Sequence, residues 1–229
     1  MQSYLPGAVG VSRLSVYETT APDGLHGGTP HMHLTCSEGY VVTAGEGRVQ
    51  TLSGEGYRET PLTAGTVAWF RPGTVHRLVN DGGLRLVVLM QNSGLPEAGD
   101  AVLTFPRDVL DDPERYGAAA VLPGGGDLAH AYRRRDLAVT GFLALRAGGP
   151  EAFTAFCATA AALVAPHLGA WRQRWEAGAL EAALETGRQL DALEKSDLAH
   201  LANGGIEVLA GPTESGKHGM CGLLETYIP

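Results

Sequence analysis

The sequence has little positive charge, and what there is shows no clustering. Only two of its 229 residues are lysines, and 17 Lys and Arg are outnumbered by 25 Asp and Glu, which gives a net charge of −8. The longest basic run is Arg133, Arg134 and Arg135. A surface that follows the phosphates of nucleic acid or of anionic lipid needs clustered cations. We therefore expect neither nucleic acid nor membrane among the partners.

Cysteine and long apolar runs are also scarce. The three cysteines, Cys36, Cys157 and Cys221, form no CxxC pair, so no disulfide or cysteine-metal framework is visible. The longest apolar run, 158–166, is far shorter than the roughly 20 residues of a membrane-spanning helix. The first residues lack the basic and apolar regions of a signal peptide. These absences predict a cytoplasmic, soluble protein.

Glycine and proline, by contrast, are abundant, with 32 and 13 residues and no repeating period. Up to Phe105 they separate short runs rich in β-branched and aromatic residues, a spacing typical of an antiparallel sandwich or barrel. The predicted strands are 11–17, 39–43, 48–52, 67–70, 75–80 and 84–91. The glycine clusters at 44–47 and 81–83 are predicted to close tight hairpins between them.

The amino-acid composition changes after Phe105. Ala, Leu, Glu and Arg dominate there, and apolar residues recur at helical spacing. Pro166 is predicted to end one helix, and the glycines at 204–205 to stop the last one. Trp171 and Trp175 share one helix face, where they pack in the core, over the barrel or across a homodimer. We expect an α+β protein in three parts: a mainly β domain at 1–105, a helical region at 106–205, and an extended segment at 206–229 that returns to the barrel.

One segment has the pattern of a metal site. His31 and His33 are two residues apart, so in a strand both side chains face the same side. Glu38 follows after a short turn, and His76 arrives on a later predicted strand. Three neutral imidazoles and one carboxylate suit a divalent first-row metal, with two positions open if its geometry is octahedral. Such open positions let a metal act on a substrate.

These segments resemble the two sequence motifs of the cupin superfamily. Four positions match its first motif: His31, His33, Glu38 and Gly45. Four match its second motif: Gly65, Gly73, His76 and Asn80. Leu25 stands where the first motif opens with glycine and Arg71 where the second has proline, so both departures fall on backbone positions and not on ligands. The resemblance covers about residues 10–105, implies a small β-barrel or jelly roll, and leaves the helical half unexplained.

Strand alternation proposes residues around the ligands. Tyr40 shares the face of Glu38, so it either hydrogen-bonds a substrate oxygen or fills the core. Neighbouring predicted strands supply further candidates for substrate contact, each of which fits surface or core packing as well: Trp69, Arg71, Arg48 and Gln91. Among these Arg71 is of most interest, because a guanidinium near a metal holds a carboxylate or phosphate.

The resemblance implies several activities and does not choose among them. We expect an enzyme whose metal, one of Fe, Mn, Ni, Zn, Cu or Co, acts on a small oxygenated substrate with dioxygenase-type chemistry. The alternatives are a sugar or sugar-phosphate isomerase, with Glu38 as a base, and a non-catalytic module that binds a small ligand. In either case a homodimer is the expected assembly.

Overall fold

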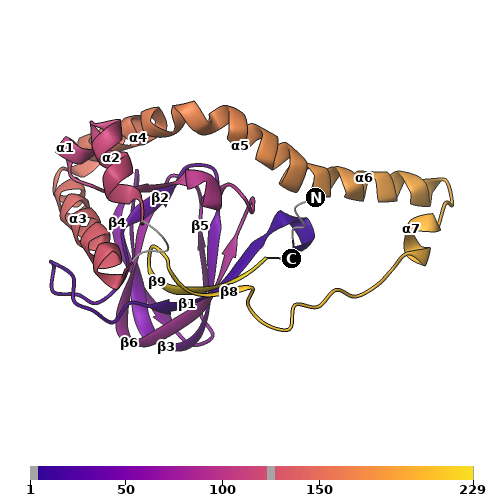
Figure 1. Cartoon of the computed structure of the whole chain (residues 1–229), viewed down its shortest axis with the longest axis horizontal. Coiled ribbons are helices and arrows are strands. Elements are labelled where there is room, and N and C mark those ends of the chain that lie inside the picture. The colour runs from indigo at the N-terminus through magenta and orange to yellow at the C-terminus, as the bar shows by residue number, and fades with distance from the viewer. Residues whose placement is uncertain (1–4, 123–126, 229) are drawn as a thin grey trace.

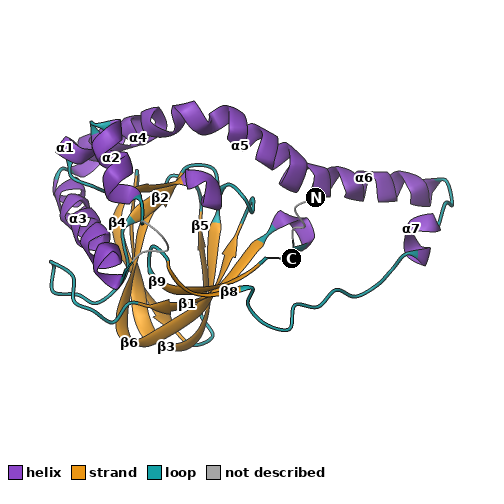
Figure 2. Ribbon diagram, viewed as in Figure 1, coloured by secondary structure: helices purple, strands orange, loops and turns teal. Residues whose placement is uncertain are grey.

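The computed structural model describes residues 5–122 and 127–228. An antiparallel β-barrel occupies the N-terminal half and helices occupy most of the C-terminal half (Figure 2), which confirms the predicted α+β class. Nine strands are found among the described residues: β1 (Gly10–Val16), β2 (His31–His33), β3 (Glu38–Ser53), β4 (Gly56–Thr63), β5 (Val67–Phe70), β6 (Val75–Met90), β7 (Ala101–Leu103), β8 (Glu214–His218) and β9 (Gly222–Tyr227).

The sheet is built around two long strands, β3 and β6, which pair with each other along most of their length. The main path runs β4-β3-β6-β1-β9-β8, while β5 pairs with β3 and the short β2 lies between β6 and β7. The C-terminal segment supplies its last two strands, because β9 pairs antiparallel with β1 and places Leu224 opposite Leu14.

The two predicted hairpin turns at 44–47 and 81–83 are wrong. Each lies inside one continuous strand of 16 residues, β3 or β6, and the register between these strands shifts between Val42 and Gly47. Gly45 has φ +72°, and a Cβ there would meet the carbonyl oxygen of Gly83 at 2.2 Å. Glycine therefore serves here to bend two paired strands at the same place rather than to reverse the chain.

Seven α-helices lie among the described residues: α1 (Arg107–Leu110), α2 (Pro113–Ala120), α3 (Leu128–Ala147), α4 (Gly149–Val164), α5 (Leu168–Trp175), α6 (Glu181–Glu194) and α7 (Ala199–Ala202). Helix α3 lies along one flank of the barrel, and α4 to α6 run across its top and beyond it (Figure 1). Contact with the barrel is close, since a Cβ at Gly141 of α3 would meet the carbonyl oxygen of Thr104 at 2.1 Å.

Pro166 does not end a helix, contrary to the prediction. The turn Ala165–His167 is a 3-10 helix that joins α4 to α5, and Glu176–Leu180 joins α5 to α6 as a π-helix. Proline at the start of a helical turn loses no hydrogen bond that the turn needs, so the run continues. The result is one helical stretch, Gly149–Glu194, of 46 residues. Its length and its apolar composition are sufficient to cross a membrane, which is weak evidence of membrane insertion when it stands alone.

Two hydrophobic cores hold the molecule together. One fills the barrel and includes Leu14, Tyr40, Leu78 and Leu86. The other lies between the barrel and α3 to α5, and Phe142 and Phe156 are among its buried members. Trp171 belongs to this second core, where its indole Nε1 donates to the carbonyl oxygen of Ala98 at 3.1 Å. Trp175 is more than one-third exposed, so the tryptophan pair divides between core and surface.

Candidate metal centre

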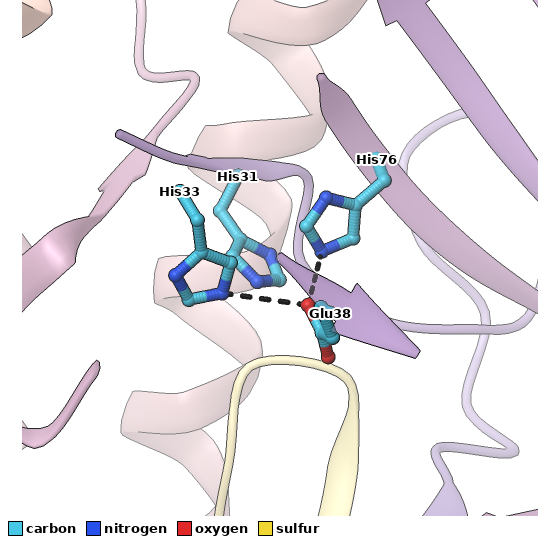
Figure 3. Close-up of side chains that lie close together, drawn as sticks. All are labelled: His31, His33, Glu38 and His76. Carbon is cyan, nitrogen blue, oxygen red and sulfur yellow. Dashed lines mark ion pairs between the residues drawn. The ribbon is translucent and has the colours of Figure 1, made fainter. Parts of the chain in front are cut away.

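Strand pairing brings the four predicted ligand residues together. His31 and His33 lie two apart on β2, and His31 is the direct partner of His76 on β6. Glu38 is the first residue of β3, reached from β2 by a four-residue loop. All four side chains are buried, and one ligand atom from each lies within 4.8 Å of the others. Figure 3 shows the three imidazoles and the carboxylate directed at one point.

Each histidine is oriented by a hydrogen bond from its outer nitrogen, Nδ1. The Nδ1 of His31 lies 2.9 Å from the carbonyl oxygen of Thr29, and that of His76 lies 3.1 Å from the carbonyl oxygen of Thr74. A carbonyl oxygen only accepts, so Nδ1 carries the proton in both rings. The lone pair of Nε2 is thus left to face the centre of the cluster, which is the form in which imidazole binds a metal.

The third histidine is held by a carboxylate that the sequence analysis missed. His33 Nδ1 lies 3.0 Å from Oδ2 of Asp100, a residue with no exposed surface. The other oxygen of Asp100 accepts from the backbone N–H and the hydroxyl of Thr35, at 2.8 and 2.7 Å. Asp100 ends the π-helical turn Pro96–Asp100, and β2 pairs with the strand that follows it, β7. No motif marks this position, because the contact depends on chain packing across 67 residues.

Burial and mutual contact shift the ionisation of the cluster. Burial and the neighbouring His76 and His33 hold the pKa of His31 well below its ordinary 6.5. Burial also lowers the pKa of His33, but the hydrogen bond with Asp100 and the nearby carboxylate of Glu38 outweigh it and raise that pKa to about 9. Burial raises the pKa of Glu38, yet the charge of His76 and the close imidazole of His33 bring it well below 4.5. The site therefore favours positive charge beside its carboxylates.

Two buried polar atoms without a hydrogen-bond partner indicate that a cation fits the cluster. Oε2 of Glu38 and Nε2 of His76 are 3.0 Å apart and buried, yet neither has a hydrogen-bond partner among the described residues. Oε2 of Glu38 also lies 3.4 Å from Nε2 of His33. Unpaired acceptors in an apolar interior are costly, and a shared divalent cation satisfies them at once. The nitrogen-rich donor set matches first-row transition metals rather than Ca²⁺ or Mg²⁺.

The cluster opens onto a partly open cavity of about 380 Å³ between the barrel strands and the C-terminal hairpin. His31, His33 and Glu38 lie on its wall, and apolar side chains make up much of the rest, among them Val88, Met90 and Leu224. The turn of the β8–β9 hairpin passes beside Glu38 (Figure 3), and Cys221 of that turn also lines the cavity. The C-terminal segment thus closes one side of the site.

Tyr40 lies within the barrel core and not on the wall of this cavity. It is 1% exposed and packs edge to face on Phe70, with ring centroids 5.3 Å apart. Burial, with the charge of Glu38, raises the pKa of Tyr40 well above its ordinary 10, so the phenol stays protonated. Its surroundings are those of a core side chain.

The four other predicted substrate contacts also lie away from the cavity. Trp69 is 75% exposed and lines a separate surface hollow of about 480 Å³ between β3, β4 and β5. Arg71 is exposed in the loop after β5. Arg48 forms ion pairs with Glu59 and Asp81 on the surface, and the exposed Gln91 accepts a hydrogen bond from the backbone of Ser37.

Comparison with known proteins places the site in a recognised domain. A family model described as "Cupin domain" matches residues 16–91, a span that contains all four ligand residues. No curated protein matches the chain. Among solved structures, an uncharacterized conserved protein with a double-stranded β-helix domain from Klebsiella pneumoniae is 24% identical over 36% of this chain and 64% of its own, with a TM-score of 0.28. The chain therefore spans less than two thirds of that protein.

Two further solved structures are similar to part of this chain. The Streptomyces nucleoside dehydratase Pac13 is 19% identical over 44% of this chain and 70% of its own, with a TM-score of 0.34. The capsular polysaccharide assembling protein CapF from Staphylococcus aureus is 19% identical over 44% of this chain and 29% of its own, with a TM-score of 0.33. Each of these structures aligns with less than half of this chain.

Proposed function

We propose, from the premise that residues 16–91 form a cupin domain, that this protein is a metal-dependent enzyme acting on a small oxygenated substrate. His31, His33, Glu38 and His76 are the proposed ligands. The observation that carries the proposal is the convergence of four buried ligand atoms within 4.8 Å beside a cavity of about 380 Å³. That volume lies in the range of small-molecule sites.

The metal supplies Lewis acidity toward substrate oxygens and, where it is redox-active, electron transfer for chemistry with dioxygen. The protein supplies the rest. Hydrogen bonds to Thr29, Thr74 and Asp100 fix the three imidazoles with Nε2 inward. The apolar part of the wall lowers the local polarity, which strengthens electrostatic interactions beside it. Fe, Mn, Ni, Zn, Cu and Co all accept such a donor set.

Dioxygenase-type chemistry is the form of this function that the cavity favours. A sugar or sugar phosphate presents hydroxyl groups all round and needs many hydrogen-bonding partners. Much of the wall is instead apolar, and Val88, Met90 and Leu224 line the same cavity as the ligand residues. In the isomerase alternative Glu38 acts as the base, since its carboxylate lies on the cavity wall within reach of a bound substrate.

The first experiment is elemental analysis of the purified protein. We expect close to one transition-metal ion per chain in the wild type and a loss of most of it in His76→Ala. The matched control is His26→Ala, which removes an exposed imidazole from a loop outside the cluster. Equal metal content in all three proteins would refute the metal-dependent function.

The second experiment separates the reaction classes. The metal-loaded protein is given a panel of diols, keto-enols and sugar phosphates in an oxygen electrode, with product analysis by mass spectrometry. Oxygen uptake that requires His76 identifies a dioxygenase. Aldose–ketose interconversion without oxygen uptake identifies an isomerase, and saturable binding with no product identifies a binding module.

Assembly and location stay predictions. A homodimer and a cytoplasmic location were expected from the sequence. Sedimentation velocity at several concentrations tests the first, and fractionation of the native cells tests the second. Recovery in the membrane fraction would show that the long helical stretch Gly149–Glu194 inserts.

A further inference from the structure

Three arginine side chains are buried among the described residues: Arg77, Arg134 and Arg135. Arg77 forms an ion pair with Asp23 and donates from Nε to the carbonyl oxygen of Gly28. Arg135 forms an ion pair with Asp136 at 2.8 Å and donates to the oxygens of Thr19 and Thr20. Two of the three buried cations are thus neutralised by a carboxylate.

Arg134 differs from both. Its guanidinium donates only to the carbonyl oxygens of Ala120 and Gly219, at 3.2 and 3.0 Å. No carboxylate of the described residues forms an ion pair with it, and its buried Nε has no hydrogen-bond partner there. The side chain is 8% exposed. A buried cation without an anion is unfavourable, so its retention calls for a partner that the folded chain itself does not supply.

The position of Arg134 identifies where that partner lies. Arg134 is on the wall of the cavity that also holds His31, His33 and Glu38. The other cation on this wall, Lys217, is already paired with Glu214. A guanidinium carries more N–H donors than the two that Arg134 uses. The cavity therefore has the ligand cluster on one part of its wall and a cation without an ion-pair partner on another.

We propose that Arg134 is an anion-binding residue of this cavity and that the substrate is an apolar carboxylic acid. The inference rests on the proposed function for the role of the metal, and it names the substrate class. The carboxylate is bound by Arg134, while the oxygenated end of the same molecule reaches the ligand cluster. The apolar walls between them accommodate the body of the molecule.

Charge balance favours a carboxylate over a phosphate. One guanidinium matches the single charge and the planar oxygens of a carboxylate. A dianionic phosphate ester needs more positive charge than this wall offers, because Glu97 and Glu214 also line it. The sequence analysis expected Arg71 to bind a carboxylate or phosphate. We assign that role instead to Arg134 of α3, in the helical half.

The test is calorimetric titration of the metal-free, full-length protein with benzoate, with benzamide as the neutral analogue. We expect saturable benzoate binding and binding of benzamide weaker by about tenfold or more. Arg134→Gln should weaken benzoate binding by a similar factor. The control is Arg133→Gln, which removes the same charge from the adjacent, exposed position of the same helix and should leave binding unchanged.

Several outcomes would overturn the inference. Benzoate binding no tighter than benzamide in the wild type does so without any variant, so a misfolded Arg134→Gln leaves the test intact. Arg134→Lys offers a second variant that keeps the charge and loses the planar fork, with partial binding expected. An equal loss in Arg133→Gln would show a general surface effect. Tighter binding of inorganic phosphate would refute the carboxylate class.

Failure here is separable from failure of the proposed function. If the wild type carries metal but benzoate does not bind, only the anion site is wrong. If benzoate binds in an Arg134-dependent way and neither the wild type nor His76→Ala holds metal, the anion site stands and the metal-dependent function falls.

Discussion

Strand β6 and helix α6 have similar lengths, 16 and 14 residues, yet their side chains lie in opposite environments. Val75 to Asn80 of β6 are all buried, because His76, Leu78 and Asn80 face the barrel interior while helices and a loop cover the other face. Helix α6 has no buried residue, and its Leu184 and Leu190 are 49% and 59% exposed. Regular secondary structure alone therefore does not tell which part of this chain carries stability and chemistry.

The first prediction tests whether burial, rather than a place in a helix, decides how much a side chain contributes to stability. Phe142→Ala on α3 removes a fully buried ring between helix and barrel, and should lower the free energy of unfolding by about 3–5 kcal/mol. Leu143→Ala alters the next residue, whose side chain is 38% exposed, and should cost less than about 1 kcal/mol. Urea denaturation measures both. Similar losses in the two variants would mean that α3 does not pack as described.

The second prediction concerns the carboxylate behind His33. Asp100→Asn keeps the size of the side chain but weakens its hold on the imidazole, and should reduce metal affinity by about 10–100-fold. Competition titration with a chromogenic chelator measures this. Glu97→Gln is the control, since Glu97 lies in the same π-helical turn and bonds only to the backbone N–H of Gly94. Unchanged affinity in Asp100→Asn would remove Asp100 from the site.

Some residues of the site can be predicted from the sequence, and others cannot. His31, His33, Glu38 and His76 were found because strand alternation and motif spacing are local patterns that survive folding. Asp100 and Arg134 are single charged residues that reach the site or its cavity only because distant segments pack together. No periodicity marks them, and the helical half, where Arg134 lies, is outside the family match.

The fold shows the same division. The change from strands to helices near residue 105 follows from composition and periodicity, and the structure confirms the class. The hairpins at 44–47 and 81–83 were wrong because glycine at positive φ suits both a turn and a bulge. Only the pairing of β3 with β6 decides between them. The predicted helix end at Pro166 was wrong for a related reason. Proline is compatible both with the end of a helix and with the first turn of a 3-10 helix, and the structure has the second.

The third prediction uses pH to test the ion pair between Arg77 of β6 and Asp23 of the loop that covers it. Burial raises the pKa of Asp23, but its bonds with Arg77 outweigh this and leave the pKa below 3.8. A lowered folded pKa means that the stabilisation is complete above the unfolded pKa and is lost as pH falls through the folded value. Asp23→Asn should therefore be about 1–2 kcal/mol less stable than wild type at neutral pH. The difference should shrink once the pH falls below 3.8. A difference that is the same at pH values well above and well below 3.8 would show that the ion pair contributes nothing.

The smallest effect is expected on α6. Leu184→Ala shortens a side chain that is half exposed and replaces it with the residue of highest helix propensity. The free energy of unfolding should stay within about 0.5 kcal/mol of wild type. Urea denaturation at two protein concentrations, tenfold or so apart, makes this informative about assembly. If a second copy of the chain covers this face, the urea midpoint of the wild type rises with protein concentration. Leu184→Ala then lowers the free energy of unfolding by more than the roughly 0.5 kcal/mol expected for a monomer. A midpoint independent of concentration in both proteins leaves α6 a solvent-exposed arm and argues against a dimer built on it.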